Sequence, residues 1–148
     1  MYGLNVPRKT ASESKMEYVI GLALALAVAG AATMIGLDRE RSFYPTVLMV
    51  IASYYVLFAV MGGSGQTLAI EILVACGFLL LAMLGFKKNL WLVAAAIVGH
   101  GAFDLVHHFL IENPGVPHWW AGFCLAFDAV AGGWFAARLI MGKRTGAT

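Results

Sequence analysis

The stretch LWLVAAAIVGHGAFDLVHHFLI, residues 90–111, is an apolar run long enough to cross a bilayer, and it carries four ionisable side chains. A membrane-spanning helix needs about 20 predominantly apolar residues, so this length is typical of one. Each ionisable group inside such a helix costs about 2.5 to 3.5 kcal/mol on insertion scales. The stretch therefore predicts a transmembrane helix whose polar residues are compensated inside the protein.

The rest of the chain has the same apolar character. Of its 148 residues, 61% are hydrophobic and 12% are charged, and the mean hydropathy is +0.81. A soluble domain of this size needs more polar surface, and here the apolar residues form long runs instead of an amphipathic period. The net charge of +2, without a basic stripe interleaved with aromatic residues, argues against nucleic acid as a partner. The expected surroundings are the lipid bilayer.

Five apolar segments predict five transmembrane helices, so the predicted fold class is all-α, a polytopic membrane protein built as a five-helix bundle. The connections are short, which makes consecutive helices antiparallel neighbours. The predicted spans are residues 17–37, 45–62, 67–86, 90–111 and 119–141. The domain organisation that follows is a polar N-terminal segment at 1–16, a transmembrane domain at 17–141 and a basic C-terminal tail at 142–148. We expect the first span to be an uncleaved helix, with a signal peptide as the alternative.

The distribution of basic residues predicts the orientation. An odd number of spans places the two termini on opposite faces of the membrane. Seven of the ten Lys and Arg residues fall on the face that carries the turns at 38–41 and 87–89 and the C-terminal tail. Because cytoplasmic loops carry an excess of Lys and Arg, this predicts a cytoplasmic C-terminus.

Six ionisable side chains fall inside the predicted spans at matched depth. Counted along the helices, all of them lie between the midplane and the face that carries the turn at 62–66 and the loop at 112–118. On the fourth span, Asp104 and His107 lie within about 40° of His100 around the helix axis. The pattern predicts one shared buried site, formed by Glu71, His100, Asp104, His107, His108 and Asp128.

The residue types in this site favour a divalent metal ion. Imidazole and carboxylate groups are ligands for Zn, Fe, Mn or Cu, and spacings of four and seven residues bring them to one helix face. We expect the metal ligands to be His100, Asp104 and His107, with His108 as a fourth, dispensable one. Glu71 and Asp128 are expected to act as additional ligands or as a general base. A metal-dependent enzyme acting on a lipidic or membrane-soluble substrate is the favoured function, although the sequence leaves enzymatic activity open.

Other interpretations stay open at this point. Asp, Glu and His residues inside a helix bundle also form proton or ion pathways, in a small channel or in a subunit of a larger complex. A purely structural polar cluster is the third interpretation, because Asp–His pairs also fix the register between helices. A homo-oligomer is a further possibility. A haem is less favoured, because no histidine on another span is available as an axial partner.

The last third of the chain resembles a known family. The motif GHGAFDLVHH, a proline-containing loop and the motif CLAFDAVAGGWFAA together resemble a family of small bacterial integral membrane proteins, domain of unknown function 6010. The resemblance implies a polytopic protein of the bacterial inner (plasma) membrane and supplies no activity. The positions of this chain that match the family pattern are His100, Asp104, His107, His108, Cys124, Asp128 and Trp134.

Overall fold

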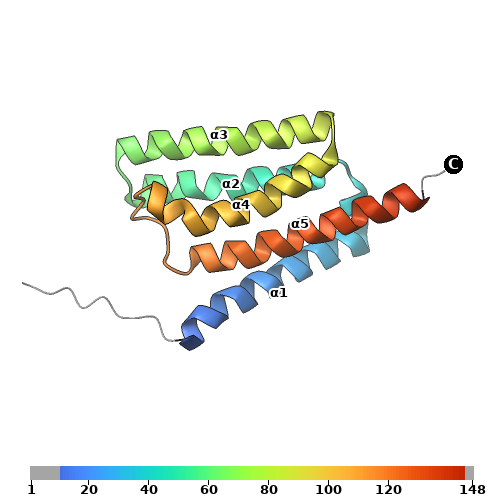
Figure 1. The fold of residues 1–148 in the computed structure, drawn as a ribbon, viewed down its shortest axis with the longest axis horizontal. Helices are drawn as coiled ribbons and strands as arrows, with labels where there is room; N and C mark the ends of the chain where they lie inside the picture. Colours follow the sequence, from blue (N-terminus) through green and yellow to red (C-terminus); the bar gives the residue numbers. More distant parts are fainter. Residues whose placement is uncertain (1–10, 146–148) are drawn as a thin grey trace, which may run out of the picture.

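The computed structural model describes residues 11–145, and the side chains of residues 15–142. All regular structure in this part of the chain is helical, which confirms the all-α fold class (Figure 1). The elements in chain order are α1 (Ala11–Ile35), the short 3-10 helix η1 (Leu37–Arg39), α2 (Phe43–Gly62), α3 (Gly65–Lys87), α4 (Leu90–Leu110) and α5 (Trp120–Thr145).

The helices begin and end where local chemistry directs them. Gly36 ends α1 with a φ of 79°, a left-handed conformation that glycine adopts without steric cost. The side chains of Ser64 and Asn89 cap α3 and α4, because each accepts a hydrogen bond from a backbone N–H of the first turn, at 3.1 and 3.0 Å. Pro45 lies in the first turn of α2, where its missing N–H has no partner to lose.

Two helices extend beyond the predicted spans. α1 begins at Ala11, upstream of the predicted start at residue 17, and α5 continues to Thr145, past the predicted end at residue 141. Residues 11–16 of the predicted N-terminal segment and residues 142–145 of the predicted tail are therefore helical. The rest of those two segments, residues 1–10 and 146–148, lies outside the described residues.

The outer surface of the bundle is the surface of a membrane protein. All five long helices are long and apolar enough to cross a membrane. Large apolar side chains point outward, such as Met34, Leu73 and Phe109, which are 88%, 72% and 78% exposed. A soluble monomer rarely exposes apolar patches of this extent, whereas hydrocarbon solvates them. The chain is a multi-pass membrane protein.

Consecutive helices from α2 to α5 pack as antiparallel neighbours, whereas α1 runs parallel to α5 (Figure 1). Within the described residues α1 makes no extended contact with α2, so the prediction that these two helices are neighbours is wrong. α4 has its largest contact with α5 and also packs on α3 and α2, while α1 packs on α5. Glycines bring these helices close together: Gly21 of α1 lies against the backbone of Phe123, and a Cβ on Gly132 of α5 would lie 2.6 Å from Val98 of α4. This close packing of α4 on α5 positions the polar residues described next.

The two halves of the bundle differ in their interiors. In the half that contains η1, the core is apolar and includes the fully buried side chains of Leu48, Val93 and Ile97. Buried carboxylates and imidazoles from α3, α4 and α5 occupy the half that contains the connection between α4 and α5. The fold thus brings the buried carboxylates and imidazoles of α3, α4 and α5 together in one half of the bundle.

Candidate functional site

The polar stripe of α4 points into the bundle. His100, Asp104 and His107 are all buried. His108, one residue further on, is exposed, and its ring packs against Phe109 with the ring centroids 3.6 Å apart. A rotation of about 100° per residue carries His108 off the buried face. The structure therefore places this predicted ligand outside the site.

Three of the buried residues form a compact group, which we call the HDD group: His100 and Asp104 of α4 and Asp128 of α5. His100 Nδ1 hydrogen-bonds to Asp128 Oδ2 at 2.8 Å and lies 3.5 Å from Asp104 Oδ2. One potential ligand atom from each residue lies within 4.8 Å of the other two, and all three side chains are buried. Asp128, predicted to be an additional ligand or a base, thus lies among the primary ligand candidates.

Gly101 allows the HDD group to form. A Cβ at this position would lie only 2.9 Å from the Cβ of Asp128 and 3.3 Å from the Cα of Leu125. Any larger residue would therefore push α5 away from α4 at the level of Asp128. Gly99, on the same helix, has open space around the corresponding position. At the level of Asp128 the closeness of the two helices therefore depends on Gly101, as it depends on Gly132 at the level of Val98.

Several carboxylate oxygens of the HDD group lack a hydrogen-bond partner among the described residues. They are both oxygens of Asp104 and Oδ1 of Asp128. The Tyr55 hydroxyl and the Cys124 thiol lie beside the Asp104 carboxylate without completing a well-formed hydrogen bond. A buried carboxylate without partners is costly, and native proteins rarely retain one without a reason. These three oxygens are buried in the interior of the bundle.

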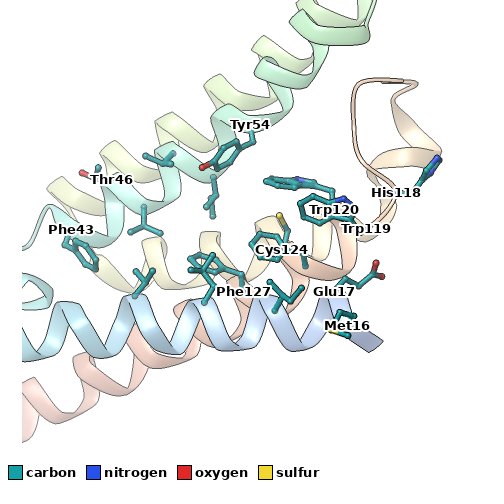
Figure 2. A pocket seen from close by; sticks show the side chains of 17 residues that line it. Met16, Glu17, Phe43, Thr46, Tyr54, His118, Trp119, Trp120, Cys124 and Phe127 are labelled. Carbon is teal, nitrogen blue, oxygen red and sulfur yellow. The ribbon is translucent and has the colours of Figure 1, made fainter. Parts of the chain in front are cut away.

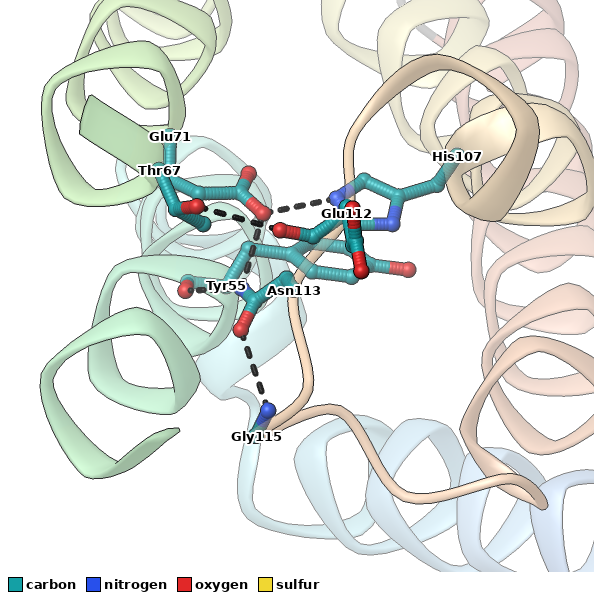
Figure 3. A network of polar contacts seen from close by, with 7 residues as sticks. All are labelled: Tyr55, Thr67, Glu71, His107, Glu112, Asn113 and Gly115. Carbon is teal, nitrogen blue, oxygen red and sulfur yellow. Dashed lines mark hydrogen bonds and ion pairs between the residues drawn. The ribbon is translucent and has the colours of Figure 1, made fainter. Parts of the chain in front are cut away.

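A second polar group, the HEN group, lies nearer the end of the bundle and contains His107, Glu71 and Asn113 (Figure 3). His107 Nε2 hydrogen-bonds to Glu71 Oε1 at 2.8 Å. The Asn113 side-chain amide donates to the same oxygen at 2.8 Å and to the backbone carbonyl of Tyr55 at 3.2 Å. These bonds tie α2, α3 and α4 to the connection that follows α4.

The connection between α4 and α5 is fixed to the bundle at further points. The side-chain oxygen of Asn113, Oδ1, accepts a hydrogen bond from the backbone N–H of Gly115 at 3.2 Å, and Thr67 Oγ1 donates to the backbone carbonyl of Glu112 at 3.1 Å. Gly115 also lies directly against the backbone of Phe58 and of Gly62, where a side chain would not fit. The connection therefore closes the end of the bundle over the HEN group.

Tyr55 of α2 lies between the two groups and has ring contacts with a histidine of each. Its ring stacks on His107, with centroids 3.9 Å apart and planes 22° from parallel, and it lies 6.3 Å from the His100 ring. The sequence predicted one site of six residues, whereas the structure forms two adjacent groups of three. His107, predicted to be a metal ligand, is instead the partner of Glu71, and Glu71 is likewise engaged away from the HDD group.

Two residues that shape the site, Asn113 and Gly101, were not predicted from the sequence. Asn113 directly precedes a proline in a turn, a pattern that ordinarily marks only the end of a helix. Gly101 lies in a helix that contains another glycine without such a role. The one available signal was position: Asn113 follows the polar stripe of α4 within two turns of His107, at the depth of Glu71.

The opposite end of the bundle contains one buried ion pair. Arg138 Nε of α5 lies 2.8 Å from Asp38 Oδ2, and Thr33 Oγ1 donates to the same oxygen at 2.8 Å. The Asp38 side chain is fully buried and Arg138 is 30% exposed. A permanent cation therefore balances this carboxylate.

Comparison of the chain with protein-family models, with curated proteins and with solved structures finds no match. The chemistry of the site therefore has to be argued from its own geometry.

Proposed function

We propose that this multi-pass membrane protein binds a divalent metal ion through the HDD group. The observation that carries the proposal is a charge imbalance: two buried carboxylates share one imidazole. Even a protonated His100 cancels only one of the two negative charges. An uncompensated carboxylate costs several kcal/mol in a low-dielectric interior, and a divalent cation would remove that cost.

The geometry of the HDD group suits a metal ion. Zinc binds imidazole nitrogen and carboxylate oxygen at about 2.0 to 2.2 Å with nearly tetrahedral angles, so two ligand atoms on one ion are about 3.3 to 3.6 Å apart. The present spread of up to 4.8 Å has to close by about 1 Å, and the 2.8 Å between His100 Nδ1 and Asp128 Oδ2 has to open by less than about 1 Å. One nitrogen and two carboxylates form a rather hard donor set, which favours Zn, Fe or Mn over Cu.

A metal ion held by three protein ligands keeps a position open for water or substrate, and it supplies Lewis-acid chemistry there. We extend the proposal to a metal-dependent enzyme acting on a lipidic or membrane-soluble substrate. In this proposal His100, Asp104 and Asp128 are ligands. Glu71 and His107 fix the helices around them and take no direct part.

A pathway for protons or ions across the whole membrane has weaker support. Beyond His100, toward the end of the bundle that contains η1, the described core continues with the buried apolar side chains of Ile97 and Val93. A proton would have to cross this layer of apolar side chains before it reached Tyr44 or Asp38 near η1. The polar groups are therefore better suited to a site reached from one side.

The location of the site is part of the same proposal. The excess of Lys and Arg at the end that contains η1 favours a cytoplasmic C-terminus, with the HDD group in the outer half of the bacterial inner membrane. The resemblance to domain of unknown function 6010 supports this location and marks the HDD residues, and it is retained as a proposal.

The experiment that tests the proposal is metal analysis of the purified protein by inductively coupled plasma mass spectrometry. We expect about one Zn, Fe or Mn per chain in the wild type and less than about a tenth of that in Asp104→Asn. The matched control is His108→Ala, because it removes a histidine from the same helix but outside the site, and we expect it to keep its metal. Absence of metal from the wild type, after reloading with each of these ions, would rule the proposal out.

A further inference from the structure

A long apolar groove runs between α1 and α2, with α5 as its floor (Figure 2). Its volume is about 1300 Å³. The walls include Leu24 and Val28 from α1 and Val50 and Ile51 from α2, and Phe127 lies on the floor. α1 packs against α5, and within the described residues it makes no extended contact with α2. The groove is therefore open sideways, toward the surroundings of the bundle.

The groove lies at membrane depth, so hydrocarbon is its natural content. All three helices that form it are long and apolar enough to span a membrane. Thr46 and Tyr54 are the polar side chains that the described walls of α1 and α2 contribute between Ile20 and Val28, so water finds few hydrogen-bonding partners there. An empty volume of this size loses dispersion contacts on every side. A hydrocarbon chain entering from the bilayer fills the space and exposes no polar group.

The length and polarity of the groove match one phospholipid in one leaflet. Along α1 it extends from Glu17 to Val28, which at 1.5 Å per residue is about 17 Å, close to half of the 30 Å hydrocarbon core. Its polar end carries Glu17 and His118, with Trp119 beside them (Figure 2). A carboxylate and an imidazole complement the ammonium and the phosphate of a zwitterionic headgroup, and Trp favours the membrane interface.

The floor of the groove reaches the HDD group at one residue. Cys124 lines the groove, and its thiol lies beside the Asp104 carboxylate on the inner side. Cys124 is also one helical turn from Asp128, on the side of the polar end of the groove. A phospholipid with its headgroup near Glu17 would therefore have the junction between headgroup and acyl chain at about the level of Cys124.

We propose that the groove binds a zwitterionic phospholipid, of the phosphatidylethanolamine class, from the leaflet that contains the HDD group. The bound lipid presents its headgroup–chain junction to the wall formed by Cys124. Only the role of this lipid as a substrate presented to the HDD group rests on the proposed metal function. The lipid site itself follows from the shape and polarity of the groove.

The test is native mass spectrometry. The protein is reconstituted into vesicles that contain about equal amounts of phosphatidylethanolamine and phosphatidylglycerol, and it is then extracted into a mild detergent. We expect the wild type to retain about one phospholipid, with phosphatidylethanolamine preferred at least about threefold. Val50→Trp and Val28→Trp fill the groove from opposite walls and should reduce retention at least about fivefold. Leu73→Trp places the same bulk on an exposed face of α3 and should leave retention unchanged.

The possible outcomes separate the two proposals. Loss of lipid from the groove variants with an unchanged metal content supports the lipid site and shows that these variants are folded. Retention of lipid by Asp104→Asn after its metal is lost supports it as well. Equal retention in Val50→Trp, Val28→Trp and Leu73→Trp, or a wild type that releases all phospholipid, overturns the lipid site whatever the metal analysis gives. Equal retention of the two lipid classes overturns the assignment of the headgroup.

Discussion

The two ends of the bundle handle buried aspartates in different ways. At the end that contains η1, Asp38 is paired with Arg138, whose guanidinium carries a permanent charge. At the other end, Asp104 and Asp128 share His100, which offers at most one positive charge to two carboxylates. Both ends hide carboxylates from lipid: the first leaves one of their oxygens without a hydrogen-bond partner among the described residues, Asp38 Oδ1, and the HDD group at the second leaves three.

This difference shows that burial of a charge is not by itself a sign of function. Arg138 balances the charge of Asp38 within the chain and Thr33 adds a hydrogen bond, while Asp38 Oδ1 has no partner among the described residues. The HEN group has one imidazole and one amide on one oxygen of its single carboxylate, and the other oxygen, Glu71 Oε2, has no partner there either. The HDD group alone has more acidic than basic side chains, and this imbalance is what a bound cation would correct.

The largest expected effect on the free energy of unfolding comes from breaking the ion pair between Arg138 and Asp38. Arg138→Met leaves the fully buried Asp38 carboxylate without its cation, and breaking a buried pair in this way costs about 3 to 5 kcal/mol. We expect about 3 kcal/mol, because Arg138 is 30% exposed. The free energy of unfolding in mixed detergent micelles measures it.

The control for this variant is Arg39→Met, which removes an exposed arginine from the same end of the bundle. Surface substitutions of this kind change the free energy of unfolding by less than about 0.5 kcal/mol. If the two variants had the same free energy of unfolding, the Asp38–Arg138 pair would not stabilise the protein. The contrast between a charge-balanced end and an unbalanced end of the bundle would then be unsupported.

The next effect tests the packing that forms the HDD group. Gly101→Ala places a methyl group 2.9 Å from the Asp128 Cβ, so α5 has to move away from α4. Overpacking of this kind costs about 1 to 3 kcal/mol, and the metal content should fall with it. Gly99→Ala meets nothing within 4 Å and should be neutral or stabilising by about 0.5 to 1 kcal/mol. Equal behaviour of the two alanine variants would contradict the geometry.

The HEN group should affect stability without affecting metal. Glu71→Gln keeps an oxygen that can accept from Asn113 but removes the charge from the hydrogen bond with His107. We expect a loss of about 1.5 kcal/mol in the free energy of unfolding, the lower end of the range for a hydrogen bond to a charged group. Metal analysis of the same sample should match the wild type. A metal content that fell with Glu71→Gln would show that the two groups act as one site.

The smallest expected change in stability belongs to the metal-free HDD group. Asp104→Asn removes a surplus carboxylate, so in the presence of a chelator the free energy of unfolding should not fall and should rise by up to about 1 kcal/mol. On addition of zinc, the wild type should gain stability in proportion to the logarithm of the free zinc concentration, and the variant should not. A destabilised, metal-free Asp104→Asn would indicate a structural role for this carboxylate.

Hydropathy was sufficient to predict the five helices, because each span had to be apolar over its full length. It was not sufficient to predict the ends of α1 and α5, where polar residues at a membrane face continue a helix as readily as they end one. The beginning of α1 at Ala11 is an example, because a polar sequence can satisfy its backbone hydrogen bonds within a helix.

The site was predictable in part for a related reason. Helical spacing placed His100 and Asp104 on one face, and depth added Asp128. The separation of His107 from the HDD group was not predictable, because it depends on how α3 and α5 are rotated about their axes and on how closely they approach α4. Those quantities depend on Gly101 and on Asn113, neither of which forms part of a recognisable pattern.

The most direct test of the central claim is X-ray absorption spectroscopy at the zinc edge of the zinc-loaded wild type. A cation that balances the HDD group should show one imidazole nitrogen and carboxylate oxygens at about 2.0 to 2.2 Å, and the signal should disappear in Asp104→Asn. A first shell with two or more imidazoles, with sulfur at about 2.3 Å, or with water alone would contradict the account.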